Sequence, residues 1–222
     1  MTEIIFLSLK VATGAMLFVL PLAIIVARIL ANTSIVPRTI LSSFVHLPLV
    51  LPPVVTGYLL LILFRRDGAI GAVLESLGVQ LTFSWIGAAL AAAVMAFPLV
   101  VRPIRLAFEQ ADDGLEEIAA TLGANRWSRF FRVALPMAWP GIIAGFVLGF
   151  AKALGEFGAT ITFVSNIPGE TQTLSLAIYT LLQSPQGDSA ALTLIGVSIA
   201  LSLIAVIASE IIMNMMSRRS EK

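Results

Sequence analysis

The stretch "EEIAATLGANRWSRFFRVALP", from Glu116 to Pro136, stands out in a chain that is otherwise mostly apolar. A glycine, Gly123, divides it. On both sides of this glycine, aliphatic and aromatic residues are set against acidic or basic ones, which favours two short amphipathic helices joined by a turn. We therefore expect this segment to lie on the inner surface of a membrane rather than across it. A solvated interfacial loop is the alternative.

The composition of the whole chain is that of an integral membrane protein. Its 222 residues are 58% hydrophobic and 12% charged, with a mean hydropathy of +0.97, and soluble domains carry about twice that share of charge. The net charge of +1 offers no basic stripe, so no nucleic-acid partner is expected. The absence of cysteine excludes disulfides and thiolate metal sites.

Apolar runs long enough to cross a bilayer as helices predict an all-α, polytopic protein with five spans. These runs cover residues 4–31, 39–64, 84–106, 137–158 and 190–213. The first run is too long for a secretion signal. The stretch 173–184 is short and polar, so we expect a re-entrant or interfacial helix there. A sixth span at this place is the alternative.

The distribution of arginine indicates the orientation of the spans, because positive charge gathers in cytoplasmic loops. Most basic residues fall on one side of a five-span protein, between spans one and two, between spans three and four, and at the C-terminus. The N-terminus is then outside and the C-terminus cytoplasmic. Arg65 and Arg66 are exceptions, which Asp67 and Glu75 partly neutralise.

Prolines interrupt the second predicted span in "HLPLVLPPVVTGYLLL", from His46 to Leu61. Pro52 and Pro53, together with Pro48, remove backbone donors that a lipid-exposed helix cannot spare. The sequence therefore predicts a kinked helix buried among neighbours. The kink serves either packing or, as a broken helix, a translocation path.

The fourth predicted span carries small residues and one possible ion pair. Its glycines recur at every fourth position, which favours close helix packing over a mobile gate; they are Gly141, Gly145 and Gly149. Lys152 and Glu156 lie four residues apart, either as a structural pair or as part of the pathway lining. Hydroxyl and amide groups follow, which by composition are candidate pathway residues: Thr160, Thr162, Ser165 and Asn166.

Catalytic and metal-binding patterns are missing from the sequence. The single histidine, His46, is expected to be structural, near the inner interface. No H-E-x-x-H, G-x-S-x-G or G-x-x-x-x-G-K-[ST] pattern occurs. We therefore predict no catalytic residue, no metal and no cofactor in this chain, and a membrane enzyme is not supported.

The spacing within Glu116–Pro136 resembles the "EAA" loop of ABC importer permeases, E-A-A-x3-G-x9-I-x-L-P. Here Ile118 and Val133 replace the usual Ala and Ile. The resemblance implies a type I permease core, with a coupling helix that docks in a groove of a separate ATPase subunit, which uses the ATP. The implied coupling residues are Glu117, Ala119, Ala120, Gly123, Leu135 and Pro136.

Two further stretches, residues 46–61 and "GEFGATITFVSNIPGETQT" (155–173), resemble the molybdate permeases of molybdate/tungstate ABC importers. Sulfate permeases are close relatives, so sulfate/thiosulfate or tungstate remains an alternative cargo. The resemblance implies one permease domain over 1–222, with a coupling segment at 109–136, in the cell inner membrane. It also implies a homodimer, two ATPase subunits and an extracytoplasmic molybdate-binding protein. The expected pathway residues are Pro52, Pro53, Lys152, Glu156, Thr160 and Thr162.

Overall fold

The computed structural model describes residues 1–68, 70–111, 113–185 and 187–220, and it contains helices and no strand within these ranges. Lys222, one of the basic residues at the C-terminus on which the predicted orientation rests, lies outside the described residues. In chain order the helices are α1 (Thr2–Asn32), α2 (Ile35–Val50), α3 (Pro53–Phe64), α4 (Gly71–Ser76), α5 (Trp85–Gln110), α6 (Asp113–Thr121), α7 (Arg126–Arg129), η1 (Phe130–Ala134), α8 (Leu135–Met137), α9 (Trp139–Leu154), α10 (Gly158–Val164), α11 (Leu174–Leu182) and α12 (Asp188–Ser220).

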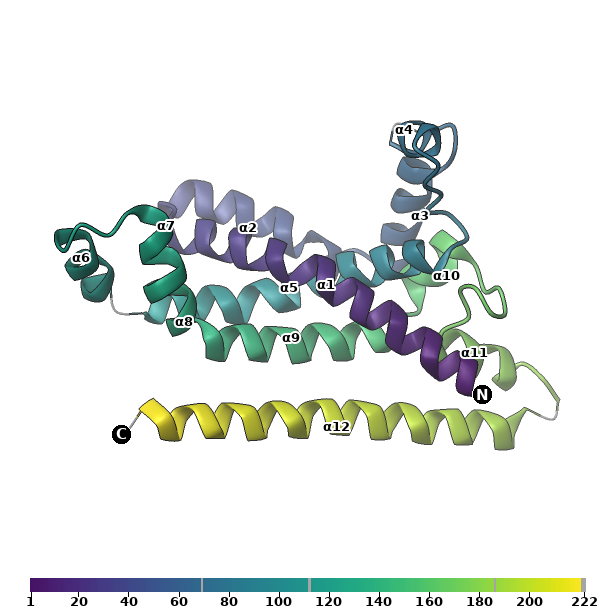
Figure 1. The fold of residues 1–222 in the computed structure, drawn as a ribbon. Coiled ribbons are helices and arrows are strands. Elements are labelled where there is room, and N and C mark those ends of the chain that lie inside the picture. The colour runs from purple at the N-terminus through teal and green to yellow at the C-terminus, as the bar shows by residue number, and fades with distance from the viewer. Residues whose placement is uncertain (69, 112, 186, 221–222) are drawn as a thin grey trace.

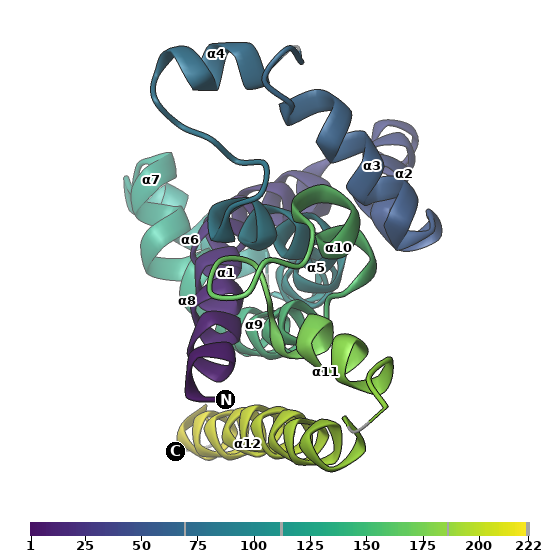
Figure 2. The same cartoon turned by 90° about the vertical axis from the view of Figure 1, so that its right-hand side faces the viewer.

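Long helices run side by side along one axis, which is horizontal in Figure 1. In the view along that axis, α1, α5 and α9 lie at the centre, with α12 at one edge and α4 at the opposite edge (Figure 2). Among the described residues, three helices are long and apolar enough to cross a membrane, and there are up to five spans if each of two bent pairs counts as one. The all-α, polytopic fold class is therefore confirmed.

Small residues let the central helices approach closely. A Cβ added at Gly141 would lie 2.5 Å from the carbonyl oxygen of Pro103, and one at Gly145 would lie 2.8 Å from that of Val100. Gly149 is equally crowded, by Val100 and Met16. The glycine face of α9 thus packs against α5 and α1, as close helix packing requires.

The second predicted span consists of two helices with a sharp break between them, at the prolines that predicted a kinked or broken helix. Helix α2 ends at Val50, and α3 leaves it at an angle of 106°. Leu51 is extended, as the residue before a proline usually is, and neither Pro52 nor Pro53 has an N–H to continue the helical hydrogen bonds. Within the described part of this chain, α2 buries Val45, whereas α3 buries Thr56, Gly57 and Leu60.

The fourth predicted span is shorter than expected. Helix α9 ends at Leu154, with Gly155 as its C-cap, and α10 begins at Gly158. Lys152 is therefore in the helix, whereas Glu156 lies in the turn beyond it. Before α9, the chain from Arg126 to Met137 meets the span at a bend of 66°.

The two ends of the bundle differ. Helices α6, α7 and α8 gather at one end, where α12 also finishes, while the N-terminus, α4, α10 and α11 lie at the other (Figure 1). Helix α11 has nine residues and is about 14 Å long, too short to span. At that end Arg65 pairs with Asp67 at 3.1 Å, and Arg66 with Glu75 at 3.4 Å, as the acidic neighbours suggested.

Candidate functional site

The turn at Gly123 has the geometry that the sequence predicted. Helix α6 ends at Thr121, and Gly123 has φ +85°. The N–H of Gly123 donates to the carbonyl of Ala120 at 3.0 Å, and the N–H of Ala124 donates to that of Ala119 at 3.0 Å. These two bonds form a Schellman motif, which needs a left-handed residue and so favours glycine.

Helix α7 starts directly after this turn. Asn125 is its N-cap, and its side-chain Oδ1 accepts from the N–H of Ser128 at 2.8 Å, the usual role of asparagine there. The prediction of two short helices joined at Gly123 is therefore confirmed.

Apolar side chains project from this helix pair, and they define what we call the coupling surface: Leu115, Ile118, Leu122, Trp127 and Phe131. Their exposed fractions run from 46% to 81%. The rings of Trp127 and Phe131 stack at 6.2 Å between centroids. A cluster of exposed, large apolar side chains on an otherwise polar segment is typical of a contact surface.

The predicted coupling residues fall into two groups. Glu117, Ala119, Ala120 and Gly123 lie together on α6 and its turn, with Glu117 and Ala120 exposed. Leu135 and Pro136 lie instead at the elbow that leads into α9. There the N–H of Leu135 reaches back to the carbonyl of Phe130 in a π-turn, and Pro136 has no N–H to restore the α-helical pattern.

An ion pair that sequence reasoning missed holds the coupling segment to the bundle. Nη2 of Arg28, near the end of α1, donates to both carboxylate oxygens of Glu116, at 2.6 and 2.7 Å. The same guanidinium lies 5.4 Å from the ring centroid of Phe108 on α5. The partners are 88 residues apart, so no local pattern could have paired them.

The predicted pathway residues gather at the opposite end, where α3 packs on α10. A Cβ at Gly158 would lie 2.7 Å from Cβ of Pro53, and one at Gly57 would lie 2.9 Å from Cβ of Thr162. Thr160 is buried, at 1% exposure, and Pro52 is exposed. Pro53 and Thr162 are thus brought into one contact region, which Gly57 and Gly158 make possible and which sequence reasoning did not identify.

Lys152 and Glu156 form a close ion pair. Nζ of Lys152 lies 2.6 Å from Oε2 of Glu156, and the Glu156 side chain is 1% exposed against 30% for Lys152. The second oxygen, Oε1, accepts from the N–H of Ala159 at 3.0 Å. Glu156 therefore satisfies the first turn of α10 as well as the lysine.

Ser165 and Asn166 belong to the loop after α10. Ser165 has φ +64°, which is strained for a residue other than glycine. Thr171 supports it, since its hydroxyl donates to the Ser165 carbonyl at 3.1 Å. Nδ2 of Asn166 donates to the hydroxyl of Thr180 at 2.7 Å. The loop is thus tied to α11.

The arrangement of these helices matches that of known importers. A chain in the solved structure of a bacterial alginate ABC transporter, in complex with an alginate pentasaccharide-bound periplasmic protein, has a TM-score of 0.74 and 21% identity, covering 100% of this chain and 79% of that one. A chain of an amino acid ABC transporter gives a TM-score of 0.60 and 16% identity, covering 96% of this chain and 92% of that one. At these identities the likeness shows the fold alone, and that fold is the one of an ABC importer permease.

The chain belongs to the family of binding-protein-dependent transport system inner membrane components, whose profile matches residues 19–219. It is 56% identical over 209 residues to the molybdenum transport system permease protein ModB of Escherichia coli K12, covering 94% of this chain and 91% of that protein. The protein of the same name from Haemophilus influenzae is 52% identical over 214 residues, covering 96% and 93%. These relatives are named as transport permeases and not as enzymes, in agreement with the expected transporter subunit.

Proposed function

We propose that this chain is the permease subunit of an ATP-driven molybdate importer, in which it forms the translocation pathway and couples to a separate ATPase. The observation that carries the proposal is the 56% identity to a molybdenum permease over 94% of the chain. The exposed coupling surface supports the ATPase partner. Since the sequence holds no phosphate-binding loop, ATP is bound and hydrolysed by that partner, and this chain needs no cofactor.

The second candidate cargo is sulfate, because the chain is also 39% identical over 160 residues to the sulfate transport system permease protein CysT of Escherichia coli K12. That match covers 72% of this chain and 58% of CysT. Both shares are smaller than those of the match to the molybdenum permease of the same organism. Molybdate is therefore the first choice, and tungstate shares its chemistry.

The proposed complex contains two copies of this permease, two ATPase subunits and an extracytoplasmic molybdate-binding protein. Helix α2 leaves apolar side chains exposed, among them Ile40, Phe44 and Val50, so a second copy has apolar surface to cover. Glu117, Ala119, Ala120 and Gly123 would contact the ATPase, with Leu135 and Pro136 at the elbow that carries its motion into the span. Pro52, Pro53, Lys152, Glu156, Thr160 and Thr162 would lie along the path.

The proposed cargo can be tested by measuring ATP hydrolysis in the reconstituted complex. ATP hydrolysis by the permease with its ATPase should rise when the molybdate-loaded binding protein is added, and should rise less with sulfate in place of molybdate. Equal or greater stimulation by sulfate would transfer the proposal to the second candidate. No stimulation by either anion would contradict import of an oxyanion.

The proposed orientation places the coupling segment in the cytoplasm, and labelling of single cysteines tests it in this cysteine-free chain. Cysteines at Ser128 and Ser217 should react only from the cytoplasmic side, and one at Thr2 only from outside. The physical reason is the arginine distribution. Reaction of the Thr2 site from the cytoplasm would require an even number of spans.

A further inference from the structure

Helix α2 carries a polar stripe that neither the fold nor the proposed coupling explains. Thr39, Ser42, Ser43 and His46 recur at the i, i+3, i+4, i+7 spacing that places side chains on one face of a helix. The rest of this helix is largely apolar. The hydroxyls of Thr39 and Ser43 donate to backbone carbonyls one turn back, at 2.9 Å each. The charged Arg38 beside them is costly in hydrocarbon, so this face is expected to meet water or protein rather than lipid chains.

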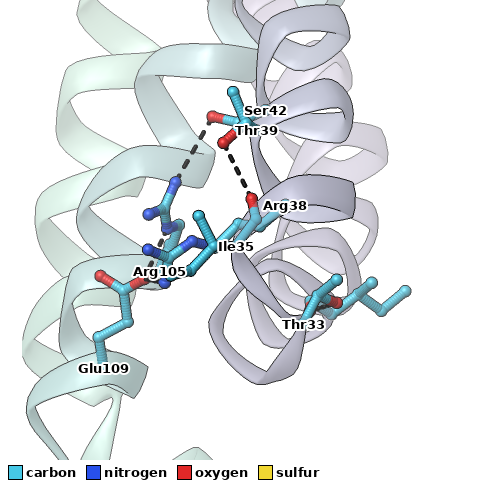
Figure 3. A network of polar contacts seen from close by, with 8 residues as sticks. Thr33, Ile35, Arg38, Thr39, Ser42, Arg105 and Glu109 are labelled. Carbon is cyan, nitrogen blue, oxygen red and sulfur yellow. Dashed lines mark hydrogen bonds and ion pairs between the residues drawn. The ribbon is translucent and has the colours of Figure 1, made fainter.

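Two arginines stand at the end of the stripe, where α2 meets α5. Oε1 of Glu109 accepts from Nη1 of Arg38 at 3.2 Å and from Nε of Arg105 at 2.8 Å (Figure 3). One carboxylate therefore serves two guanidinium groups, which leaves one excess positive charge. Each guanidinium has five N–H donors, so most of them remain available for another acceptor.

The serine between them connects the arginines to the stripe. Nη1 of Arg105 points to the hydroxyl of Ser42, which accepts at 3.5 Å (Figure 3) and also lies 3.4 Å from Nδ1 of His46. Nδ1 of His46 lies 2.7 Å from the carbonyl oxygen of Ser42. A carbonyl can only accept, so Nδ1 carries a hydrogen and the ring is held against the helix.

These side chains line an open groove of about 400 Å³, which we call the polar groove: Arg38, Thr39, Ser42, Ser43, His46 and Arg105. Its volume is many times the ~30 Å³ share of one water molecule, so a hydrated ion fits. Helix α2, which supplies most of the lining residues, begins at the end of the bundle where α6 and α7 gather (Figure 1). The break at Pro52, beside the predicted pathway residues, is at the other end of α2.

We propose that the polar groove is a weak binding site for a tetrahedral oxyanion at the coupling end of the pathway, the last site before the anion leaves. The proposal rests on the proposed function. Guanidinium groups suit the paired oxygens of such an anion. One excess charge suits a site that must also release its ligand, because conduction requires contacts that are favourable but weak.

A phospholipid phosphate offers the same chemistry as a free oxyanion. The free anion is favoured because the polar face continues from Arg38 to His46, about 12 Å along α2. The acyl chains of a lipid seated at the arginines would have to cover that polar face. Lipid composition is therefore varied in the test.

The test uses the Ser43→Cys variant, which places a single cysteine in this chain. The full permease and its ATPase are reconstituted in nanodiscs of zwitterionic lipid, without nucleotide and without the binding protein. Reaction of this cysteine with a negatively charged thiosulfonate is timed at increasing molybdate. We expect molybdate to slow the reaction. We also expect Arg105→Gln with Glu109→Gln to raise the molybdate concentration for half protection about tenfold, since charge-assisted hydrogen bonds are lost.

The paired substitution removes one cation and one anion, so the groove keeps one excess positive charge, on Arg38, and loses the guanidinium donors of Arg105. The matched control is Arg102→Gln, an exposed arginine of the same helix that does not line the groove; it should keep the protection. A molybdate concentration for half protection that is unchanged in Arg105→Gln/Glu109→Gln would overturn the site.

Two other results would also overturn it. One is no protection by molybdate in a preparation whose ATP hydrolysis responds to the loaded binding protein, and this result leaves the proposed function intact. The other is a reaction rate that falls with anionic lipid and ignores molybdate, which assigns the groove to lipid phosphate. Loss of the ATP response in the unaltered complex would instead contradict the proposed function.

Discussion

Gly123→Asp is expected to abolish substrate uptake while the permease still inserts into the membrane in near-normal amount. Gly123 has φ +85°, and a Cβ there would meet nothing within 4 Å. The backbone strain is about 1 kcal/mol for a residue in this left-handed region, which a folded bundle can tolerate. A carboxylate in the proposed ATPase contact costs on the order of several kcal/mol if it is buried without a partner. Docking should therefore fail before folding does.

Copurification of the ATPase with the tagged permease measures this effect beside uptake. Gly78→Asp is the matched control, because Gly78 has φ +74° and equally open surroundings but follows α4 at the other end of the bundle. Gly123→Asn separates charge from bulk. Normal copurification together with normal uptake in Gly123→Asp would remove the coupling role from this turn.

Lys152→Met is expected to reduce the amount of folded permease strongly. The Glu156 side chain is 1% exposed, and its carboxylate would keep one N–H partner, that of Ala159, in place of two partners. Removing one member of a buried ion pair costs about 3–5 kcal/mol. Glu156→Gln should be milder, because the glutamine oxygen can still accept from Ala159 and the lysine is 30% exposed.

The double variant Lys152→Met/Glu156→Gln separates the two roles of the lysine. It leaves no unpaired charge, so the amount of permease should recover toward normal, as measured by quantitative blotting of membranes. Recovery of uptake as well would make the pair structural. Recovery of the amount without uptake would place Lys152 on the anion path. Unchanged amount and unchanged uptake in both single variants would exclude the pair from the mechanism.

Much of the fold could be read from local patterns. Long apolar runs predicted α1, α5 and α12, because a bilayer sets the length of a spanning helix. The predicted and observed ends agree to within a few residues, except that α12 continues to Ser220, beyond the predicted end at 213. The structure of the coupling segment also follows from local patterns. Gly123, Asn125 and the amphipathic flanks define a Schellman turn and an N-cap with bonds between residues at most five apart.

Predictions failed where distant residues decide the geometry. Pro52 and Pro53 predicted a break but not its angle of 106°. That angle accompanies the packing of α3 on α10, where Gly57 closely approaches Ala159. The C-terminal boundary of the fourth span failed for a local reason instead. Lys152 and Glu156 were expected in one helix, whereas the Glu156 side chain bonds forward to Ala159 in the first turn of the next one.

Hydropathy, the spacing of glycine and proline, and capping residues determined the class of fold, the helices and the coupling segment, since each acts over a few turns of chain or over the thickness of a bilayer. The tertiary structure alone decided which charges on different helices meet. Arg28 reaches Glu116, and Arg38 shares Glu109 with Arg105. The polar groove exists only because α2 and α5 lie side by side. An ion pair depends on distance in space, whereas one sequence records only distance along the chain.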